Sequence, residues 1–388
     1  MRSVNNPRFF VTGGTGFIGS RLIEVLRDQL GANVTALAHR TSPGALRLAA
    51  AGVPLDLTPI NDVEGLTKAI AGHDAVLHLA YGRSGTAQDM RRTTVDGTRA
   101  LIDAALAAKV PRFVDVSTAA VYFGAPAGEI DEAAPRRKWG WSYSDEKLEA
   151  EDAVRAATAT RGLQGSVFQV AGVYGPWGET FVVNPLRNMR RGVVVLPNFG
   201  KGVSNMTYVD DVVQALILGL QDRAVGETFI VKGPGRVTRL EAYRRLEDML
   251  GYAAVEGVAA EEMAKRRGGD WAALARLPGA ALRALLASAE LKSVARETPL
   301  APAARAAWRA LGALRRGERR LAPAPSAEQT LPRIFPPDIM IDYLSAEVSF
   351  SCAKAERLLG YSPKIGLDDG MGLTREWAAW ANLLGPRL

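Results

Sequence analysis

Two side chains that could exchange a proton lie four residues apart in the segment Tyr143-Ser-Asp-Glu-Lys147. On a helix this spacing places them on one face, a single turn apart. A phenol has an ordinary pKa of about 10 and is a poor acid–base catalyst at neutral pH. A fixed ammonium nearby favours the phenolate and lowers that pKa. The pair therefore predicts a proton-transfer site on a helix over 144–159, although a surface tyrosine and a solvated lysine would show the same spacing.

A glycine-rich turn near the start of the chain favours the catalytic interpretation. The apolar run Phe9–Val11 leads directly into Gly13-Gly-Thr-Gly-Phe-Ile-Gly19, and a helical pattern follows. Between a strand and a helix, such a turn is typical of dinucleotide binding. The first glycine permits the tight turn, Gly16 lets the backbone approach a pyrophosphate, and the last lets the helix pack on the strand. The helix N-terminus then faces the phosphates with unpaired N–H groups.

The end of the next strand bears on the choice of cofactor. In a dinucleotide-binding unit, an acidic residue at this point holds the ribose 2′-OH of NAD. Here the strand Val34–Ala38 ends without a carboxylate and continues into His39 and Arg40. A guanidinium suits a 2′-phosphate, so the sequence favours NADP over NAD. The alternative is that Arg40 only begins a solvated loop.

Apolar runs alternate with helical segments from residue 8 to about 175, and this order indicates how the residues above are positioned. The runs that read as strands are 9–13, 33–38, 75–80, 113–117 and 166–170. Such alternation predicts an α/β fold of the Rossmann type, a doubly wound parallel sheet with helices on both faces. Ligands of such sheets bind beyond the carboxyl ends of the strands, where Gly13, Arg40, Ala80 and Thr118 fall.

With the glycine turn and the Tyr-Lys pair both present, the chain resembles the extended short-chain dehydrogenase/reductases, also called the NAD-dependent epimerase/dehydratase family. The resemblance runs from about Arg8 to Gly233 and resumes from about Ala346 to Trp380. It rests on the segments TGGTGFIGS, AVLHLA, FVDVSTAAVYF, AGVYGP, TYVDDVVQAL and LLGYSP. One departure is Thr94, which stands where the family has an asparagine at a helix start.

The resemblance implies an oxidoreductase that moves a hydride between a nicotinamide ring and a carbinol carbon. It places the catalytic hydroxyl at Thr118 and the acid–base phenol at Tyr143. Lys147 would lower the pKa of that phenol and hold the nicotinamide ribose. Tyr122 competes as a tyrosine, but its place in the strand motif favours packing. The cofactor contacts expected from the turn, the second strand and the resemblance together are Gly13, Gly16, Phe17, Ile18, Gly19, His39, Arg40, Asp56, Leu57, Leu79, Ala80, Tyr81, Val116, Tyr143, Lys147 and Val170.

Size, charge and cysteine content narrow the class further. At 388 residues and 47% hydrophobic, the chain can bury a large core. The single cysteine, Cys352, excludes an internal disulfide framework, and the scattered histidines lack metal-ligand spacing, so no metal is expected. The net charge of +7 suits an anionic dinucleotide, and no nucleic-acid-binding motif accompanies it. We expect no secretory signal and no membrane span, hence a cytoplasmic enzyme, and the resemblance adds a homodimer.

The composition changes after about Tyr252, which suggests a division of the chain. We expect an NAD(P)-binding domain at 1–175, to which a strand and helix return near 205–232. A smaller, mostly helical substrate-binding portion would occupy 176–388, with a helical insertion at about 255–330 rich in Ala, Arg and Leu. This insertion fits a helical layer packed on the core. The alternatives are a lid over an apolar substrate, or a basic surface at 265–320 that touches a membrane.

The sequence leaves the substrate open between two classes. A less polar ketone or alcohol is favoured, because Gly172 and Ser204 stand where nucleotide-sugar enzymes of the family often place an Asn and an Arg for the diphosphate. The substrate contacts that we expect are Phe123, Trp177 and Asn184. The main prediction is therefore an NAD(P)-dependent oxidoreductase acting at a secondary alcohol or ketone, and a nucleotide-sugar epimerase or dehydratase is the alternative. A dinucleotide sensor is disfavoured, because a pure binder needs no proton donor.

Overall fold

The structure, a computed structural model, describes residues 6–39, 41–263 and 331–388. Arg40, the candidate contact for a 2′-phosphate, lies outside the described residues. The expected helical insertion also lies outside them from residue 264 onward, and with it the lid and the membrane surface at 265–320.

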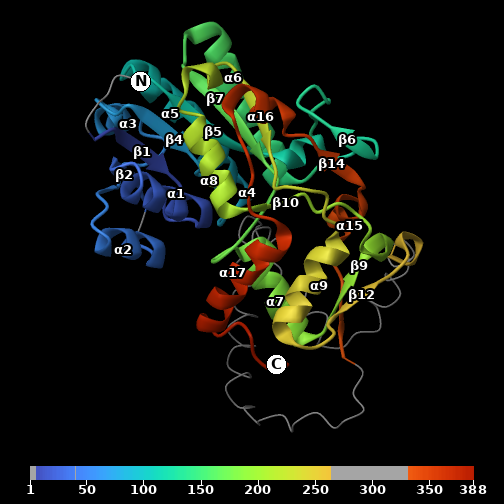
Figure 1. Cartoon of the computed structure of the whole chain (residues 1–388). Coiled ribbons are helices and arrows are strands. Elements are labelled where there is room, and N and C mark those ends of the chain that lie inside the picture. Colours follow the sequence, from blue (N-terminus) through green and yellow to red (C-terminus); the bar gives the residue numbers. More distant parts are fainter. Residues whose placement is uncertain (1–5, 40, 264–330) are drawn as a thin grey trace, which may run out of the picture.

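In the described part of the chain, a seven-stranded parallel sheet forms the centre of the molecule (Figure 1). Its strand order is β11-β7-β5-β4-β1-β2-β3. The strands are β1 (Arg8–Thr12), β2 (Asn33–Leu37), β3 (Leu55–Asp56), β4 (Ala75–His78), β5 (Phe113–Thr118), β7 (Gly165–Val170) and β11 (Thr228–Val231). The central strands are buried on both faces, so their sequences are continuous apolar runs such as Phe9–Val11. The doubly wound parallel sheet predicted from the sequence is confirmed.

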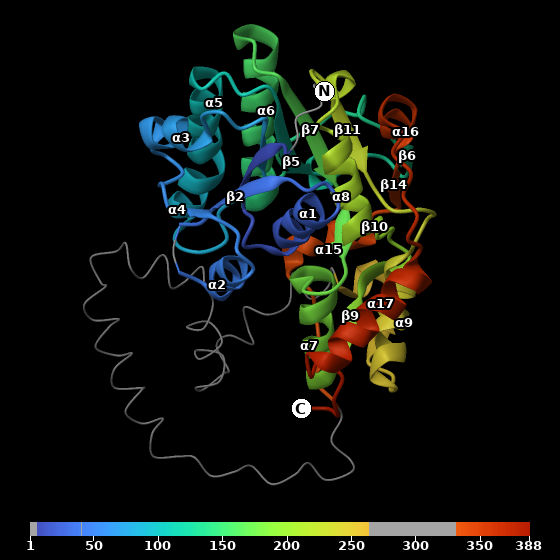
Figure 2. The same ribbon diagram turned by 60° about the vertical axis from the view of Figure 1, so that its left-hand side comes forward.

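Helices cover both faces of this sheet (Figure 2). Apolar residues of α3 (Val63–Ile70), α5 (Gly97–Ala107) and α6 (Ser142–Arg161) form one core with the sheet. Residues of α1 (Phe17–Asp28), α8 (Val209–Leu218) and α16 (Ala353–Leu359) form the core on the opposite face. Both α8 and α16 come late in the chain, so segments after residue 205 return to the central sheet.

The helix α6 carries the Tyr-Lys pair and is longer than predicted. It begins at Ser142, where the Asp145 carboxylate accepts hydrogen bonds from the backbone N–H groups of Trp139 and Gly140 at 2.9 and 3.0 Å. It ends at Gly162, whose φ of 78° is the left-handed conformation that glycine adopts readily. One stripe of the helix, which includes Lys147 and Val154, is buried against the sheet.

A third apolar core lies below the sheet, as Figure 1 shows, where the helices α7, α9 and α17 pack together with short strands. These helices are α7 (Asn184–Arg191), α9 (Arg239–Leu250) and α17 (Leu367–Trp380), and a small separate cluster contains Ile341 of α15 (Asp338–Ser345). Among the short strands, β9 (Val193–Leu196) pairs with β12 (Val255–Gly257) on one side and β13 (Arg333–Ile334) on the other. Two further pairs are β8 (Gly172–Tyr174) with β10 (Met206–Tyr208) and β6 (Gly128–Ile130) with β14 (Val348–Phe350). The remaining short elements are α2 (Pro43–Ala50), α4 (Ala87–Arg91), η1 (Arg92–Asp96), η2 (Ala119–Tyr122), η3 (Glu179–Val183), η4 (Pro197–Gly200) and η5 (Asp222–Ala224).

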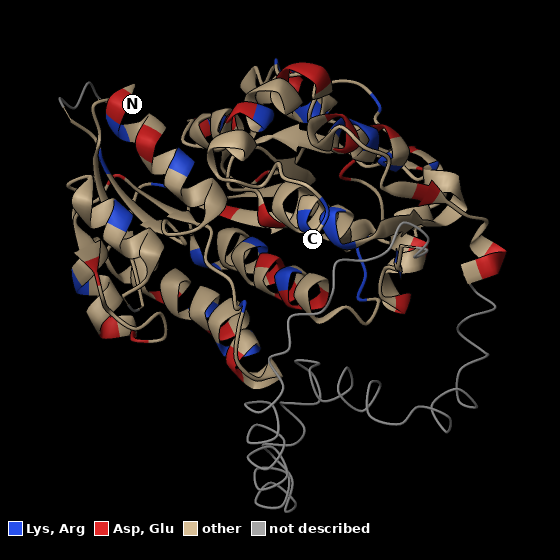
Figure 3. Cartoon of the chain, turned by 90° about the horizontal axis from the view of Figure 1, so that it is seen from below, with Lys and Arg blue, Asp and Glu red and all other residues tan. Residues whose placement is uncertain are grey.

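Acidic and basic residues are mixed along the helices seen in Figure 3. Ion pairs such as Lys68–Glu64 on α3 and Arg161–Asp103 between α6 and α5 lie on the surface. None of the helices in the described ranges is long and apolar enough to cross a membrane.

Candidate active site

The glycine turn between β1 and α1 has the close backbone contacts that a dinucleotide site requires. Gly13 has φ +70°, and a Cβ atom there would lie 2.7 Å from the carbonyl carbon of Leu79. A side chain at Gly19 would collide with the Gly13 carbonyl oxygen. Gly16 is the N-cap of α1, which begins at Phe17, and offers no side chain to cap it. The donors of this helix end therefore face the position where a pyrophosphate would bind.

The rim beside the turn contains the other expected contacts to the adenosine half. Ala38 is buried at the end of β2, and His39 beyond it is exposed. Asp56 ends β3 and accepts a hydrogen bond from the Thr58 N–H at 2.8 Å, while Leu57 is exposed. Neither Ala38 nor His39 offers a carboxylate to a ribose 2′-OH.

A buried hydroxyl–imidazole chain holds the end of β4 against this turn. Thr12 Oγ1 lies 2.6 Å from His78 Nδ1, and His78 Nε2 lies 2.8 Å from Thr98 Oγ1. The backbone N–H groups of Leu79 and Ala80 both donate to Thr12 Oγ1 at 3.2 Å. Burial lowers the pKa of His78 to about 3, so the ring is neutral. These hydrogen bonds thus fix the backbone of Leu79 and Ala80 beside the glycine turn, where a dinucleotide would bind.

Thr118 and Tyr143 meet at the carboxyl edge of the sheet. Thr118 is the last residue of β5, and Tyr143 is the second residue of α6. The two side chains interact by a hydrogen bond, which lowers the pKa of the phenol. Burial and the neighbouring Tyr81 act in the opposite direction and dominate, so the pKa of Tyr143 is raised above its ordinary value. The positive charge of Arg83 opposes that rise.

Lys147 lies one turn further along α6 and is 3% exposed. Its ammonium Nζ has no hydrogen-bond partner in the described part of the chain. The charge of this ammonium lowers the pKa values of His78 and Asp115. A buried ammonium without such a partner among the described residues, on the same sheet edge as the Gly13–Gly19 turn, fits a bound nicotinamide ribose. The ribose hydroxyl groups would accept hydrogen bonds from the Lys147 ammonium.

A cluster of aromatic side chains packs next to Tyr143. We call Tyr81, Phe123, Trp139, Trp141 and Tyr343 the aromatic wall. The ring centroid of Tyr143 lies 4.9 Å from that of Trp141 and 5.4 Å from that of Tyr81. Trp139 stacks on Phe123 at 3.8 Å and lies nearly parallel to Tyr343 at 6.2 Å. The expected substrate contact Phe123 is therefore part of a continuous apolar surface that leads to Tyr143.

The other two expected substrate contacts lie elsewhere. Trp177, with φ +71°, packs on Trp377 and Trp380 of α17 and has the Arg47 guanidinium 4.8 Å from its ring centroid. It makes no ring contact with the aromatic wall among the described residues. Asn184 is exposed at the start of α7. Of the expected cofactor contacts on the inner strands, Val170 is buried and pairs in register with Thr118, and Val116 is buried two residues before it.

Two residues of the site were not found from the sequence. Arg83 follows the expected contact Tyr81 closely, forms an ion pair with Glu179, and influences Tyr143. Its position just after the fourth strand could have pointed to it. Tyr343 comes from α15, two hundred residues after Tyr143, and no motif marks it. Among the described residues, no cluster of His, Cys, Asp and Glu could hold a metal ion.

Two curated enzymes are similar to this chain in sequence. A dTDP-glucose 4,6-dehydratase from Streptomyces niveus is 32% identical over 261 residues, 60% of this chain and 75% of that protein. A 4-hydroxy-2-methyl-3-oxo-4-farnesyl-3,4-dihydroquinoline-1-oxide ketoreductase from Stigmatella aurantiaca is 29% identical over 228 residues, 58% of this chain and 67% of that protein.

Solved structures share the fold. A dTDP-glucose 4,6-dehydratase from Streptomyces venezuelae, solved with NAD and TYD bound, has a TM-score of 0.66 at 23% identity, over 96% of this chain and 97% of that chain. The model of the NAD dependent epimerase/dehydratase family matches residues 9–231, which is more than half of the sequence and contains the glycine turn, Thr118, Tyr143 and Lys147. The protein therefore belongs to the NAD-dependent epimerase/dehydratase family.

Proposed function

We propose that the protein transfers a hydride between a nicotinamide cofactor and a secondary carbinol carbon, with Tyr143 as the acid–base group. One observation carries this proposal. Thr118 from β5 lies beside Tyr143, with Lys147 one turn along α6, at the sheet edge that also carries the Gly13–Gly19 turn. The division into a cofactor-binding portion at 1–175 and a substrate-binding portion at 176–388 is part of the proposal.

Each of the three side chains has a separate task. The cofactor, when bound, supplies the hydride chemistry. Tyr143 accepts the carbinol proton during oxidation and returns it during reduction. Thr118 hydrogen-bonds the substrate oxygen and stabilises the charge that develops on it. Lys147 would hold the ribose hydroxyls of the nicotinamide half, and its charge would then favour the Tyr143 phenolate.

Relatives favour a nucleotide-linked sugar as the substrate. Besides the dehydratase from Streptomyces niveus, a UDP-glucose 4-epimerase from Azospirillum brasilense is 32% identical over 200 residues. This reverses the preference that Gly172 and Ser204 suggested. A Cβ atom at Gly172 would lie 3.1 Å from the Phe181 ring, so this position has no room for a side chain that binds the diphosphate. Cationic side chains elsewhere would have to hold it. Arg187 and Lys201 are exposed and available for that contact.

Within that substrate class, epimerisation or ketone reduction fits the site better than loss of water. Elimination of water needs an acid and a base in addition to the phenol that exchanges the carbinol proton. The residues that follow Thr118 are Ala119 and Ala120, both buried and apolar. These two alanines therefore supply neither the acid nor the base. The carboxyl group of Glu146 on α6 is already engaged, because it interacts with the Thr94 hydroxyl. The proposal is therefore an epimerase or ketoreductase of a nucleotide-linked sugar.

The aromatic wall supports a second candidate, reduction of an apolar or aryl ketone. Stacked rings beside the acid–base residue would bind a flat, apolar group. The Stigmatella aurantiaca ketoreductase, whose named substrate is a farnesylated dihydroquinoline oxide, is 29% identical to the chain. NADP is the proposed cofactor for either reaction, because β2 ends at Leu37 and is followed by Ala38 and His39 rather than by an acidic residue.

One experiment separates the candidates. Purified protein is titrated with NAD and NADP by calorimetry, and the preferred cofactor is then used with dTDP-glucose, UDP-glucose, UDP-glucuronic acid and a set of aryl ketones. Epimerisation of a nucleotide sugar without net change in nicotinamide absorbance supports the first candidate, and so does oxidation of its carbinol with reduction of the nicotinamide. Consumption of reduced cofactor with aryl ketones alone supports the second. Binding of neither dinucleotide contradicts both.

A further inference from the structure

The strand β5 carries a buried carboxylate that the proposed reaction does not use. Asp115 is 0% exposed, and neither of its carboxylate oxygens has a hydrogen-bond partner among the described residues. An unpaired carboxylate is costly to bury, so a compensating positive charge is expected close to it.

Asp115 faces the helix α6. Side chains two residues apart on a strand lie on the same face, so Asp115 and Ser117 point the same way. The Ser117 hydroxyl donates a hydrogen bond to Glu151 of α6 at 2.7 Å. Because Lys147 and Glu151 are one turn apart on the buried stripe of that helix, Asp115 and Lys147 share the interface between β5 and α6.

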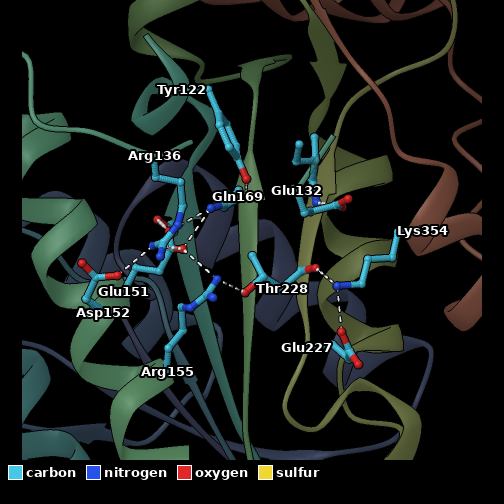
Figure 4. Close-up of polar contacts among 12 residues, drawn as sticks. Tyr122, Glu132, Arg136, Glu151, Asp152, Arg155, Gln169, Glu227, Thr228 and Lys354 are labelled. Atoms are coloured by element: carbon cyan, nitrogen blue, oxygen red, sulfur yellow. Dashed lines mark hydrogen bonds and ion pairs between the residues drawn. The ribbon is translucent and has the colours of Figure 1, made fainter. Parts of the chain in front are cut away.

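The other buried carboxylates of α6 in the described chain, Glu146 and Glu151, have partners of their own, and Glu146 interacts with the Thr94 hydroxyl. Glu151 is already bound by Ser117, by the Gln169 amide at 2.9 Å and by the Arg136 guanidinium at 2.8 Å, as Figure 4 shows for Arg136 and Gln169. The Asp115 carboxylate interacts electrostatically with the Lys147 ammonium, which is itself buried without a hydrogen-bond partner in the described chain.

The remaining neighbours do not supply a countercharge. His78, the register partner of Asp115 on β4, is neutral because burial lowers its pKa to about 3. Ser144 on α6 is buried and uncharged. Tyr143 is protonated at neutral pH because burial raises the pKa of its phenol. Asp115 is thus the acidic group that these elements leave to balance Lys147.

We propose that Asp115 is the buried countercharge of Lys147 and that it positions the ammonium for the cofactor. The inference rests on the proposed function, which places Lys147 at the nicotinamide ribose. A carboxylate across the β5–α6 interface stabilises the charged ammonium electrostatically, without a direct hydrogen bond, before the dinucleotide arrives. Asp115 is a positioning residue, because it acts through Lys147 and does not itself touch the cofactor.

A double-mutant cycle on dinucleotide affinity tests this role. The variants are Asp115→Asn, Lys147→Met and the two combined, and the ligand is whichever of NAD and NADP binds the wild type, measured by calorimetry. Asp115→Asn is expected to weaken binding about tenfold in the wild type and to change it less than about twofold in the Lys147→Met background. An equal loss in both backgrounds, or no loss in either, would overturn the proposal.

Ser166→Ala is the matched control. Ser166 is buried on the neighbouring strand β7, its hydroxyl also lacks a partner among the described residues, and it pairs in register with Val114 rather than with Asp115. It is expected to leave dinucleotide affinity unchanged. If Lys147→Met also leaves affinity unchanged, the proposed function has misplaced Lys147. If Lys147→Met weakens binding and Asp115→Asn does not, only the present inference fails.

A measurement on the wild type keeps the proposal testable should Asp115→Asn not fold. The pKa of Asp115 is raised by burial to about 6, so acidification below that point neutralises the carboxylate. Wild-type affinity is expected to weaken from about pH 7.5 to about pH 5, whereas the Lys147→Met protein shows no such step. His78 stays neutral over this range, and Glu151 is held by Arg136. Parallel pH profiles in the two proteins would overturn the proposal.

Discussion

The Tyr143 side chain interacts with the Thr118 hydroxyl on one side and packs against the Tyr81 and Trp141 rings on the other. Burial and the Tyr81 ring raise the pKa of its phenol, and Thr118 and Arg83 oppose this. We expect Tyr143→Phe to lower kcat by a factor of about 10²–10⁴, the usual contribution of a positioned acid–base group. Dinucleotide affinity, measured by calorimetry, should stay nearly unchanged because the phenyl ring keeps its packing against Trp141.

Tyr122 provides the matched control for this substitution. Its hydroxyl is buried and donates a hydrogen bond to the Gln169 side-chain oxygen at 2.7 Å. Tyr122→Phe should therefore cost about 1 kcal/mol of stability and leave turnover intact. If Tyr122→Phe abolished turnover while Tyr143→Phe retained it, the acid–base assignment would be wrong.

Single residues were predictable where local spacing carries the chemistry. The glycine turn and the Tyr143–Lys147 pair are such cases, because a turn and one helical repeat fix their geometry. Tyr343 was not predictable, since the helix that carries it reaches the site only through tertiary packing. Trp177 stays a predicted substrate contact, and its packing on Trp377 of α17 also depends on tertiary structure that the sequence does not reveal.

At the scale of elements, one buried network joins β5, α6 and β7 behind the site (Figure 4). The Glu151 carboxylate is 0% exposed and accepts hydrogen bonds from Ser117, Gln169 and Arg136. We expect Glu151→Ala to reduce the free energy of unfolding by about 1–3 kcal/mol, because Ser117 and Gln169 lose a buried acceptor while Arg136 keeps its ion pair with Asp152. Urea denaturation monitored by circular dichroism measures this loss.

The surface pair Lys68–Glu64 gives the contrasting case. Both side chains are exposed on α3, with Nζ and Oε1 2.6 Å apart. Glu64→Ala should change the free energy of unfolding by less than about 1 kcal/mol, because water screens the pair. Equal effects of Glu64→Ala and Glu151→Ala would contradict the view that the network holds these elements together.

The strand β5 also makes stability depend on pH. Burial raises the pKa of the Asp115 carboxyl group to about 6. The folded protein therefore binds a proton at Asp115 more tightly than the unfolded chain does. The stabilisation is fully present below about pH 4 and is lost as the pH rises through about 6. Relative to Asp115→Asn, the wild type should therefore lose about 1–3 kcal/mol of stability between pH 4 and 7.5. A difference that stays constant across this range in urea titrations would contradict the prediction.

Elements were predictable where they are long or buried on both faces. The five expected strands of the central sheet and the helix with Tyr143 belong to this class. The short strands β9, β12 and β13 were missed, because strands of two to four residues carry too little periodicity to identify. They are stabilised by pairing with segments distant in sequence, such as Arg333 with Val193.

For the molecule as a whole, the glycine turn predicts how ligand binding stabilises the fold. At a dinucleotide concentration of about 100 times Kd, the free energy of unfolding should rise by about 2.7 kcal/mol, visible as a higher Tm. Gly13→Ala should abolish this rise, because its Cβ would press on the Leu79 carbonyl carbon at 2.7 Å.

Gly31→Ala is the control for backbone strain. Gly31 has φ +61°, close to the +70° of Gly13, but a Cβ there meets nothing within 4 Å. Both alanines therefore strain the backbone, and only Gly13→Ala also fills the turn. The Gly31→Ala protein should keep the full rise in Tm on adding dinucleotide, and its loss there would show that strain alone explains the effect.

The return of late segments to the central sheet limits how this protein can recombine with its relatives. The edge strand β11 pairs with β7, α16 packs on the sheet behind it, and the Tyr361 hydroxyl donates a hydrogen bond to the Lys232 carbonyl at 2.9 Å. A chimaera with a single crossover near residue 175 would bring a foreign edge strand and foreign helices against native partners. Exchange of substrate specificity in this architecture therefore requires discontinuous grafts that leave 205–232 and 346–362 with their own sheet.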